Sequence, residues 1–291
     1  MSSDPTLSSF LREVYSRWSS DRALTHGAAL AYYTLFSLAP LLVLVIAIAG
    51  LAFGRAAAEG EIVEQMTGLV GADGARMIQG MIARASAPAT GLVAGAASLL
   101  TMIFGASGVV GQLQASLNQI WNAPPPPKTT SAVRSALRRR AVALGLILGV
   151  GFLLLVSLVL SAGLSALHNL VAEHLPLAGR IVPPLNFLFS FLVITALFAM
   201  IYKILPDVQL EWRDVWIGAA VTAILFSLGK SLIGVYLGRA GVTSVYGAAG
   251  SLVLVLLWIY YSAQLLFLGA EFTEVYARTY GSRREVPPAA G

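Results

Sequence analysis

The stretch GAALAYYTLFSLAPLLVLVIAIAGLAFG, residues 27–54, decides the fold class of this 291-residue chain. It lies between His26 and Arg55 and contains no charged side chain. An α-helix rises about 1.5 Å per residue, so about 20 apolar residues cross the roughly 30 Å hydrocarbon core of a bilayer. The stretch is therefore long enough to form a membrane-spanning helix.

The composition of the whole chain agrees with this interpretation. Hydrophobic residues make up 57% of the sequence, charged residues make up 11%, and cysteine is absent. Soluble domains are about a quarter charged and about half apolar, so this composition excludes an ordinary water-soluble enzyme. The absence of cysteine also excludes thiolate metal sites and a cysteine nucleophile.

Five more apolar intervals follow the first, and we predict an all-α integral membrane protein with a bundle of six membrane helices. The predicted spans are 27–54, 88–121, 141–168, 181–202, 215–238 and 247–270. Transmembrane β-strands alternate over about 10 residues, whereas these runs are continuous and longer. A cleaved signal peptide is the competing interpretation of the first run, but that run is too long for the apolar part of a signal.

Three segments surround or interrupt the spans of the membrane domain, residues 26–275. Residues 1–25 are predicted to form an amphipathic cytoplasmic segment, either in the membrane interface or docked on the bundle. Residues 56–86 carry two apolar stripes separated at Gly71–Gly74, which predicts two short amphipathic helices outside the membrane. Residues 276–291 form a predicted cytoplasmic tail.

Lysine and arginine positions set the predicted orientation, because basic residues favour the cytoplasmic side of a membrane. Of the 19 such residues, five fall in outer segments if the N-terminus is cytoplasmic, Lys230 falls inside a span, and the other thirteen fall in inner segments. The outer five are Arg55, Arg76, Arg84, Arg180 and Arg239. We therefore predict a multi-pass protein of the bacterial inner (plasma) membrane with both termini cytoplasmic.

Lys230 is the most informative single residue. It lies roughly 22 Å along the fifth predicted helix, in the outer half of the membrane. An ammonium group there costs at least about 2.5–3.5 kcal/mol unless it meets water or an anion. Lys230 could bind an anionic headgroup or substrate in a polar cavity, or it could extend its stem to the outer interface. The sequence leaves both interpretations open.

Other polar residues on the predicted helices are candidates for the same cavity. With Lys230, the candidate cavity or substrate-binding residues are Tyr32, Tyr33, Asn118, Tyr236, Tyr246, Tyr260, Gln264 and Glu271. A proton-coupling role for Glu271 requires that its side chain points into the bundle; solvation at the membrane interface is the alternative. Pro40 interrupts the hydrogen bonding of the first helix and is a candidate hinge, with static packing as the alternative.

Enzymatic signatures are absent from the sequence. It contains no Gly-x-Ser-x-Gly, no Walker loop and no His-Glu-x-x-His motif, and it has only three histidines. We therefore expect no catalytic residue, no metal, no cofactor and no nucleic-acid partner. The expected partners are membrane lipid and an anionic lipid or small-molecule substrate. Glycine-rich helix faces also permit a homo-oligomer.

The segment His26–Pro40, HGAALAYYTLFSLAP, resembles the opening helix of the YihY/BrkB family of bacterial inner-membrane proteins. Further matching motifs follow in the same order: Leu117–Trp121, Tyr202 with Pro206, Tyr236, Tyr246-Gly247, Trp258–Tyr260 and Gly269–Glu271. One departure is Ile217, where the family pattern has proline. The resemblance implies six helices with both termini inside. Family members have also carried the label ribonuclease BN.

Three functional hypotheses follow from these observations. The first is a transporter-like or lipid-handling envelope protein that uses a polar cavity containing Lys230. The second is a non-transporting membrane scaffold or assembly protein that works through residues 56–86. The third, a ribonuclease, is remote because the inner segments offer no cluster of His and Asp metal ligands.

Overall fold

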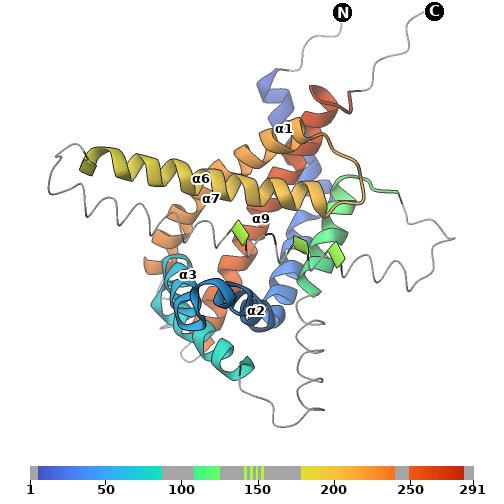
Figure 1. Ribbon diagram of the computed structural model, residues 1–291. Coiled ribbons are helices and arrows are strands. Elements are labelled where there is room, and N and C mark those ends of the chain that lie inside the picture. The colour runs from blue at the N-terminus through green and yellow to red at the C-terminus, as the bar shows by residue number, and fades with distance from the viewer. Residues whose placement is uncertain are drawn as a thin grey trace, which may run out of the picture.

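The computed structural model describes residues 6–86, 108–124, a few positions between 141 and 153, 178–239 and 249–284. Within these ranges the regular structure is helical, which agrees with the predicted all-α class. The main helices are α1 (Leu7–Ser20), α2 (Ala23–Phe53), α3 (Arg55–Ala85), α6 (Ala178–Ile204), α7 (Trp212–Arg239) and α9 (Gly250–Thr279). Residues 108–120 form another helix (Figure 1).

Helix α1 is docked on the bundle. Thr6 caps its first turn by accepting a hydrogen bond from the backbone N–H of Ser9 at 3.4 Å. Phe10 and Val14 are buried against Val275 of α9, while Leu11 and Tyr15 on the other face are exposed. The structure therefore confirms the predicted helix and favours docking, through the apolar pair at four-residue spacing, over a purely interfacial position.

Glycines terminate α2 and divide α3. Helix α2 runs without a break through Pro40, and Gly54, with φ of 83°, turns the chain into α3. Within α3, Gly71 has φ of 74° and ψ of 174°, a conformation that is accessible to glycine and strained for other residues. The predicted division of the segment 56–86 into two helical parts is thus confirmed.

The apolar stripes of α3 pack onto the bundle. Val70, Ile78 and Ile82 are buried in one cluster with Ile46 of α2 and Val255 of α9. Two methionines of the same segment, Met66 and Met77, lie partly buried against that cluster. Ordinary packing therefore accounts for the hydrophobic residues of α3.

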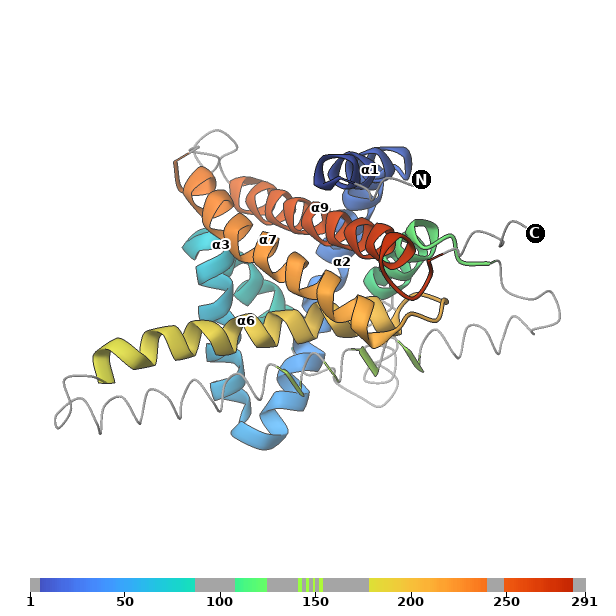
Figure 2. The same cartoon turned by 90° about the horizontal axis from the view of Figure 1, so that it is seen from above.

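Helices α6, α7 and α9 form the central unit, with α7 lying between the other two (Figure 2). Their shared core includes Tyr202 and Leu205 near the end of α6, Ala219 and Ala223 on α7, and Phe267 on α9, all of them fully buried. Small residues on α7 let the neighbouring helices approach closely.

Three helices in the described residues are long and apolar enough to cross a membrane: Ala23–Leu51, Phe187–Ile204 and Gly250–Thr279. They coincide with the predicted spans 27–54, 181–202 and 247–270. The predicted span 215–238 coincides with α7, whose last side chains lie outside the described set. The predicted spans 88–121 and 141–168 fall largely outside the described residues. The described part of the chain therefore supports three candidate spans, not the six predicted.

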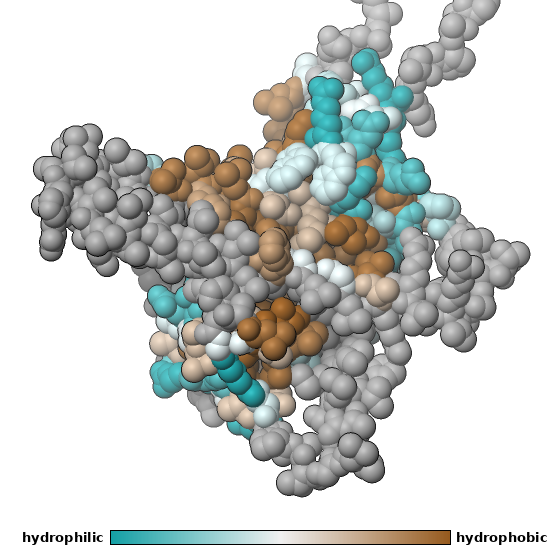
Figure 3. All heavy atoms as spheres, in the orientation of Figure 1, coloured by the Kyte–Doolittle hydropathy of each residue, from teal (hydrophilic) through white to brown (hydrophobic). Residues whose placement is uncertain are grey.

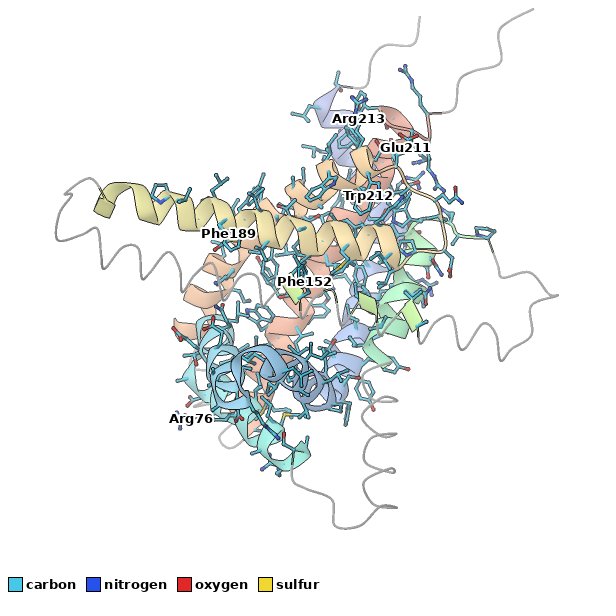
Figure 4. All side chains as sticks on the ribbon, in the orientation of Figure 1. Arg76, Phe152, Phe189, Glu211, Trp212 and Arg213 are labelled. Carbon is cyan, nitrogen blue, oxygen red and sulfur yellow. The ribbon has the colours of Figure 1, made fainter. Side chains whose placement is uncertain are left out.

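The face of the molecule seen in Figure 3 is polar at two ends and apolar between them. Hydrophilic side chains gather around α1 and over α3, and hydrophobic ones lie between these regions (Figure 3). Figure 4 places Glu211 and Arg213 toward the end that carries α1, and Arg76 on α3 at the opposite end. We call these the α1 end and the α3 end. Ile224, Leu228 and Leu232 on α7 are exposed by 49%, 62% and 70%, an apolar stripe typical of a lipid-facing helix.

Candidate functional site

A hydrogen-bonded network joins α2 to the helix 108–120 at the α1 end. His26 Nε2 lies 2.9 Å from Gln119 Oε1, and His26 Nδ1 lies 3.1 Å from Ser116 Oγ. Gln119 also donates through Nε2 to the carbonyl oxygen of Asp21 at 3.2 Å. Because the Gln119 amide oxygen can only accept, Nε2 of His26 carries the proton in this arrangement. His26 is therefore more than a boundary residue of α2.

A second network connects the helix 108–120 to the loop between α6 and α7. The Asn118 side chain donates to Asp207 Oδ2 at 2.9 Å and accepts from the Asp207 backbone N–H at 2.8 Å. Gln114 donates to the same Asp207 oxygen at 3.3 Å. The predicted cavity residue Asn118 is thus engaged in fixing a loop.

Ion pairs hold α1 against the end of α9. Arg278 Nε lies 2.7 Å from Glu274 Oε1, and Arg17 NH1 lies 3.6 Å from Glu274 Oε2. Glu13 of α1 pairs with the same two arginines, at 3.0 Å from Arg278 and 3.4 Å from Arg17. The Glu274 side chain is only 4% exposed, so its two arginine partners offset the loss of hydration.

Glu271 lies one turn before Glu274 and is enclosed more completely. It is 0% exposed, and no hydrogen-bond donor in the described part of the chain reaches either of its carboxylate oxygens. The sequence left open whether this side chain solvates the membrane interface or points into the bundle. The structure shows that it points into the bundle.

Close glycine contacts fix α7 against α9. A Cβ atom at Gly218 of α7 would lie 1.8 Å from Oγ1 of Thr273, and one at Gly269 of α9 would lie 1.9 Å from Oγ1 of Thr222. Tyr202 of α6 joins this contact, because its hydroxyl donates to the Leu266 carbonyl at 2.8 Å and lies 3.0 Å from Thr222 Oγ1. The α1 end of the three-helix unit is therefore tightly packed.

Lys230 lies on the side of α7 that faces this packed interior. Residues spaced by three and four positions share one helix face, and Ala219, Ala223 and Phe226 precede Lys230 at such spacings. Ala219 and Ala223 are fully buried, and Phe226 packs edge to face on Phe198 and Trp258, with ring centroids 5.7 Å and 6.1 Å apart. Lys230 itself is exposed. It therefore stands one turn beyond an aromatic layer and one turn before Ile233, which is partly buried against the cluster that contains Val255.

The contact glycines also place Lys230 relative to Glu271. Gly218 faces Thr273 and Gly229 faces the hydroxyl of Tyr261, so α7 and α9 run antiparallel with Lys230 level with Tyr261. Ten residues of α9, about 15 Å along the helix axis, separate Tyr261 from Glu271. The two charged candidates therefore do not share one site.

The remaining candidates are dispersed. Tyr32 and Tyr33 are 60% and 44% exposed on α2, so they do not line the packed interior. Tyr260 and Gln264 on α9 are half-buried beside Gly27, where a Cβ atom would lie 1.9 Å from Gln264 Nε2. The structure does not test Pro40 as a hinge. The Tyr236 side chain and all of Tyr246 lie outside the described residues.

Sequence reasoning missed several residues that the structure brings to the α1 end. Asp21, Ser116, Gln119 and Asp207 all take part in the networks described above. These residues lie in short links or on a helix of mixed polarity, so no periodic pattern marks them. In the described ranges, no group of three or more His, Cys, Asp and Glu side chains is arranged to hold a metal ion.

The fold and its exposed apolar helices define an all-helical membrane protein, and comparison with known proteins identifies the family. The family described as Virulence factor BrkB matches residues 14–291, so the chain belongs to the BrkB family. This confirms the resemblance drawn from the sequence motifs. No solved structure matches the chain significantly.

Curated relatives are named only as UPF0761 membrane proteins. One from Verminephrobacter eiseniae is 28% identical over 276 residues, which is 92% of this chain and 61% of the relative. One from Azotobacter vinelandii is 28% identical over 280 residues, which is 90% of this chain and 62% of the relative. One from Aeromonas salmonicida is 27% identical over 271 residues, which is 91% of this chain and 87% of the relative. The chain thus spans about three fifths of the length of the first two relatives.

Proposed function

We propose that this protein moves or handles an anionic lipid or small anion in the bacterial inner membrane, as a bundle of six membrane helices with both termini cytoplasmic. In this proposal the α1 end is cytoplasmic and the α3 end is outside.

The observation that carries the proposal is the position of Lys230. Its helix face is buried at Ala219 and Ala223 and is capped by the aromatic layer of Phe226, and Lys230 is exposed directly beyond that layer. The lipid-facing stripe of α7, which includes Leu228, lies on the other side of the helix. A lysine on the inward side of a membrane helix is best stabilised by water or by an anion. Snorkelling, the competing role, would place it on the lipid-facing side.

Flux through reconstituted protein tests this proposal. The purified protein is placed in liposomes that contain a fluorescent anionic phospholipid, and transfer between leaflets is followed by quenching; a parallel assay follows chloride efflux. The matched variants are Lys230→Met, which removes the charge, and Lys230→Arg, which keeps it. In the assay in which the parent is active, we expect Lys230→Met to lower the rate of flux at least tenfold. Lys230→Arg should retain the flux of the parent. Equal flux in Lys230→Met would remove Lys230 from the mechanism, and an inactive parent in both assays would refute the transport proposal.

A scaffold function that uses α3 is the second hypothesis from the sequence. Its apolar stripes pack on α2 and α9, which leaves a mostly polar face for any partner. Because the face of α3 that remains for a partner is mostly polar, we favour transport over the scaffold function. The absence of ribonuclease activity also remains a proposal, supported by the missing sequence motifs; purified protein with Mg²⁺ should leave RNA intact.

A further inference from the structure

Glu271 is a buried acid whose surroundings do not supply a counter-charge. It is fully enclosed, and among the described residues no hydrogen-bond donor reaches either carboxylate oxygen. Glu274, one turn further along α9, is held by two arginines. The contrast between these two neighbouring glutamates indicates that Glu271 has a role other than pairing α1 with α9.

The charged groups around Glu271 come from several elements. The Asp21 carboxyl group, just after α1, lies within hydrogen-bonding reach of Glu271, and Arg17 of α1 and Glu274 of α9 act on Glu271 electrostatically. Arg17 is shared with Glu13 and Glu274, so it does not neutralise Glu271 alone. Several other ionisable groups at this end have partners of their own. They are His26 with Gln119, Asp214 with Ser282, Arg278 with Glu13 and Glu274, and Arg283 over the Trp121 ring.

An ionised carboxylate in this position would be buried without a hydrogen-bond donor and close to two other acids, Asp21 and Glu274. Burial of an unpaired charge costs many kcal/mol, and acids in membrane helices persist where they have a function. A bound cation would compensate the negative charge and so remove this free-energy cost. Na⁺ and divalent ions need several oxygen ligands, and the described residues hold no group of three or more acidic or histidine side chains suited to a metal. A proton needs only one carboxylate oxygen.

We propose that Glu271 is a proton-binding site at the α1 end of the bundle. In the arrangement described here the carboxyl group is neutral. On opening of the contact between α1 and α9, Glu271 gives its proton to the carboxylate of Asp21, which is half-buried, and Asp21 passes it to water. Uptake follows the same route in reverse, so one proton is bound and released in each cycle. Coupling of this step to an anion at Lys230, about 15 Å away, rests on the proposed transport function, but proton binding itself does not.

The experiment is infrared difference spectroscopy of the protein in liposomes, because a protonated carboxyl group has a C=O absorption separate from that of a carboxylate. The variants are Glu271→Gln, Asp21→Asn and, as a matched control, Glu64→Gln, which changes an exposed acid on α3. Circular dichroism verifies that each variant retains its helices. If Glu271→Gln does not fold, Glu271→Asp provides the same test, since its shorter acid should move the band.

We expect the parent to show a protonated carboxyl band at neutral pH that titrates with pH and is insensitive to Na⁺. Glu271→Gln should abolish this band and Glu64→Gln should leave it unchanged. Asp21→Asn should move the titration of the band, because the Asp21 carboxyl group interacts directly with that of Glu271. A band that persists in Glu271→Gln, or that responds to Na⁺ at constant pH, would overturn the proposal. Because this readout requires no flux, its outcome is independent of the transport assay.

Discussion

The close approach of α7 and α9 at Gly269 provides the sharpest test of the fold. At Gly269 a Cβ atom would lie 1.9 Å from Oγ1 of Thr222 and 2.7 Å from the hydroxyl of Tyr202. Neither side chain can easily move away, because Tyr202 is fully buried and donates to Leu266, while Thr222 donates to the Gly218 carbonyl at 2.7 Å. In the variant Gly269→Ala, α7 must therefore separate from α9, or both hydrogen bonds must break.

The size of the effect follows from these distances. Restoring an ordinary contact of about 3.4 Å requires a displacement of about 1.5 Å along that direction. Overpacking of this kind costs typically about 1–3 kcal/mol, and each lost interhelical hydrogen bond in a membrane adds about 0.6 kcal/mol. We expect Gly269→Ala to lower the free energy of unfolding by about 2–4 kcal/mol.

The assay is reversible unfolding in mixed detergent and SDS, followed by circular dichroism. The matched control is Gly68→Ala, because a Cβ atom at this helical glycine meets nothing within 4 Å; the change should be neutral or slightly stabilising. Truncation of the opposing side chain in Gly269→Ala/Thr222→Ala should recover part of the loss, as a positive coupling between residues in contact. Equal stability of Gly269→Ala and Gly68→Ala would refute the close approach of α7 and α9.

Two other predictions concern the α1 end. Arg278→Met should destabilise the protein by about 1 kcal/mol and make the α1–α2 link more sensitive to protease, since the nearly buried Glu274 keeps only Arg17 as a partner. The control is Arg76→Met on α3, which should have little effect because the Arg76 side chain is 74% exposed and that of its partner Asp73 is 49% exposed. Tags placed at the N-terminus and the C-terminus should both be inaccessible from outside intact spheroplasts, while a tag in the polar face of α3 should be accessible. Labelling of either terminal tag from outside would contradict the proposed orientation.

Local sequence patterns predicted much of the fold. The uncharged run 27–54 is long enough for a membrane helix whatever its neighbours are, and α2 follows it closely. The apolar pair Phe10 and Val14 at helical spacing predicted α1, and Gly71 marked the interruption of α3. Patterns of this kind depend on a few adjacent residues and on their transfer from water to an apolar environment.

The candidate site was predicted less well, because it depends on how helices distant in sequence are rotated against one another. The sequence placed Tyr32 beside Glu271 in one polar interior. The structure exposes Tyr32 and encloses Glu271, because the faces of α2 and α9 that meet are set by small residues such as Gly27. The sequence did not indicate a role for Asp207, because its hydrogen-bond partners Asn118 and Gln114 lie about ninety residues away in the chain.

The sequence by itself determined that this chain is helical and suited to a membrane, because hydrophobic length and charge spacing act locally. Only the tertiary structure decided that Glu271 is enclosed beside Asp21 with no hydrogen-bond donor among the described residues, and that Lys230 is exposed on the helix face that carries the buried Ala219 and Ala223. Both outcomes depend on the rotation and register of α7 and α9. These are fixed by contacts such as that between Gly269 and Thr222, which join residues far apart in the chain.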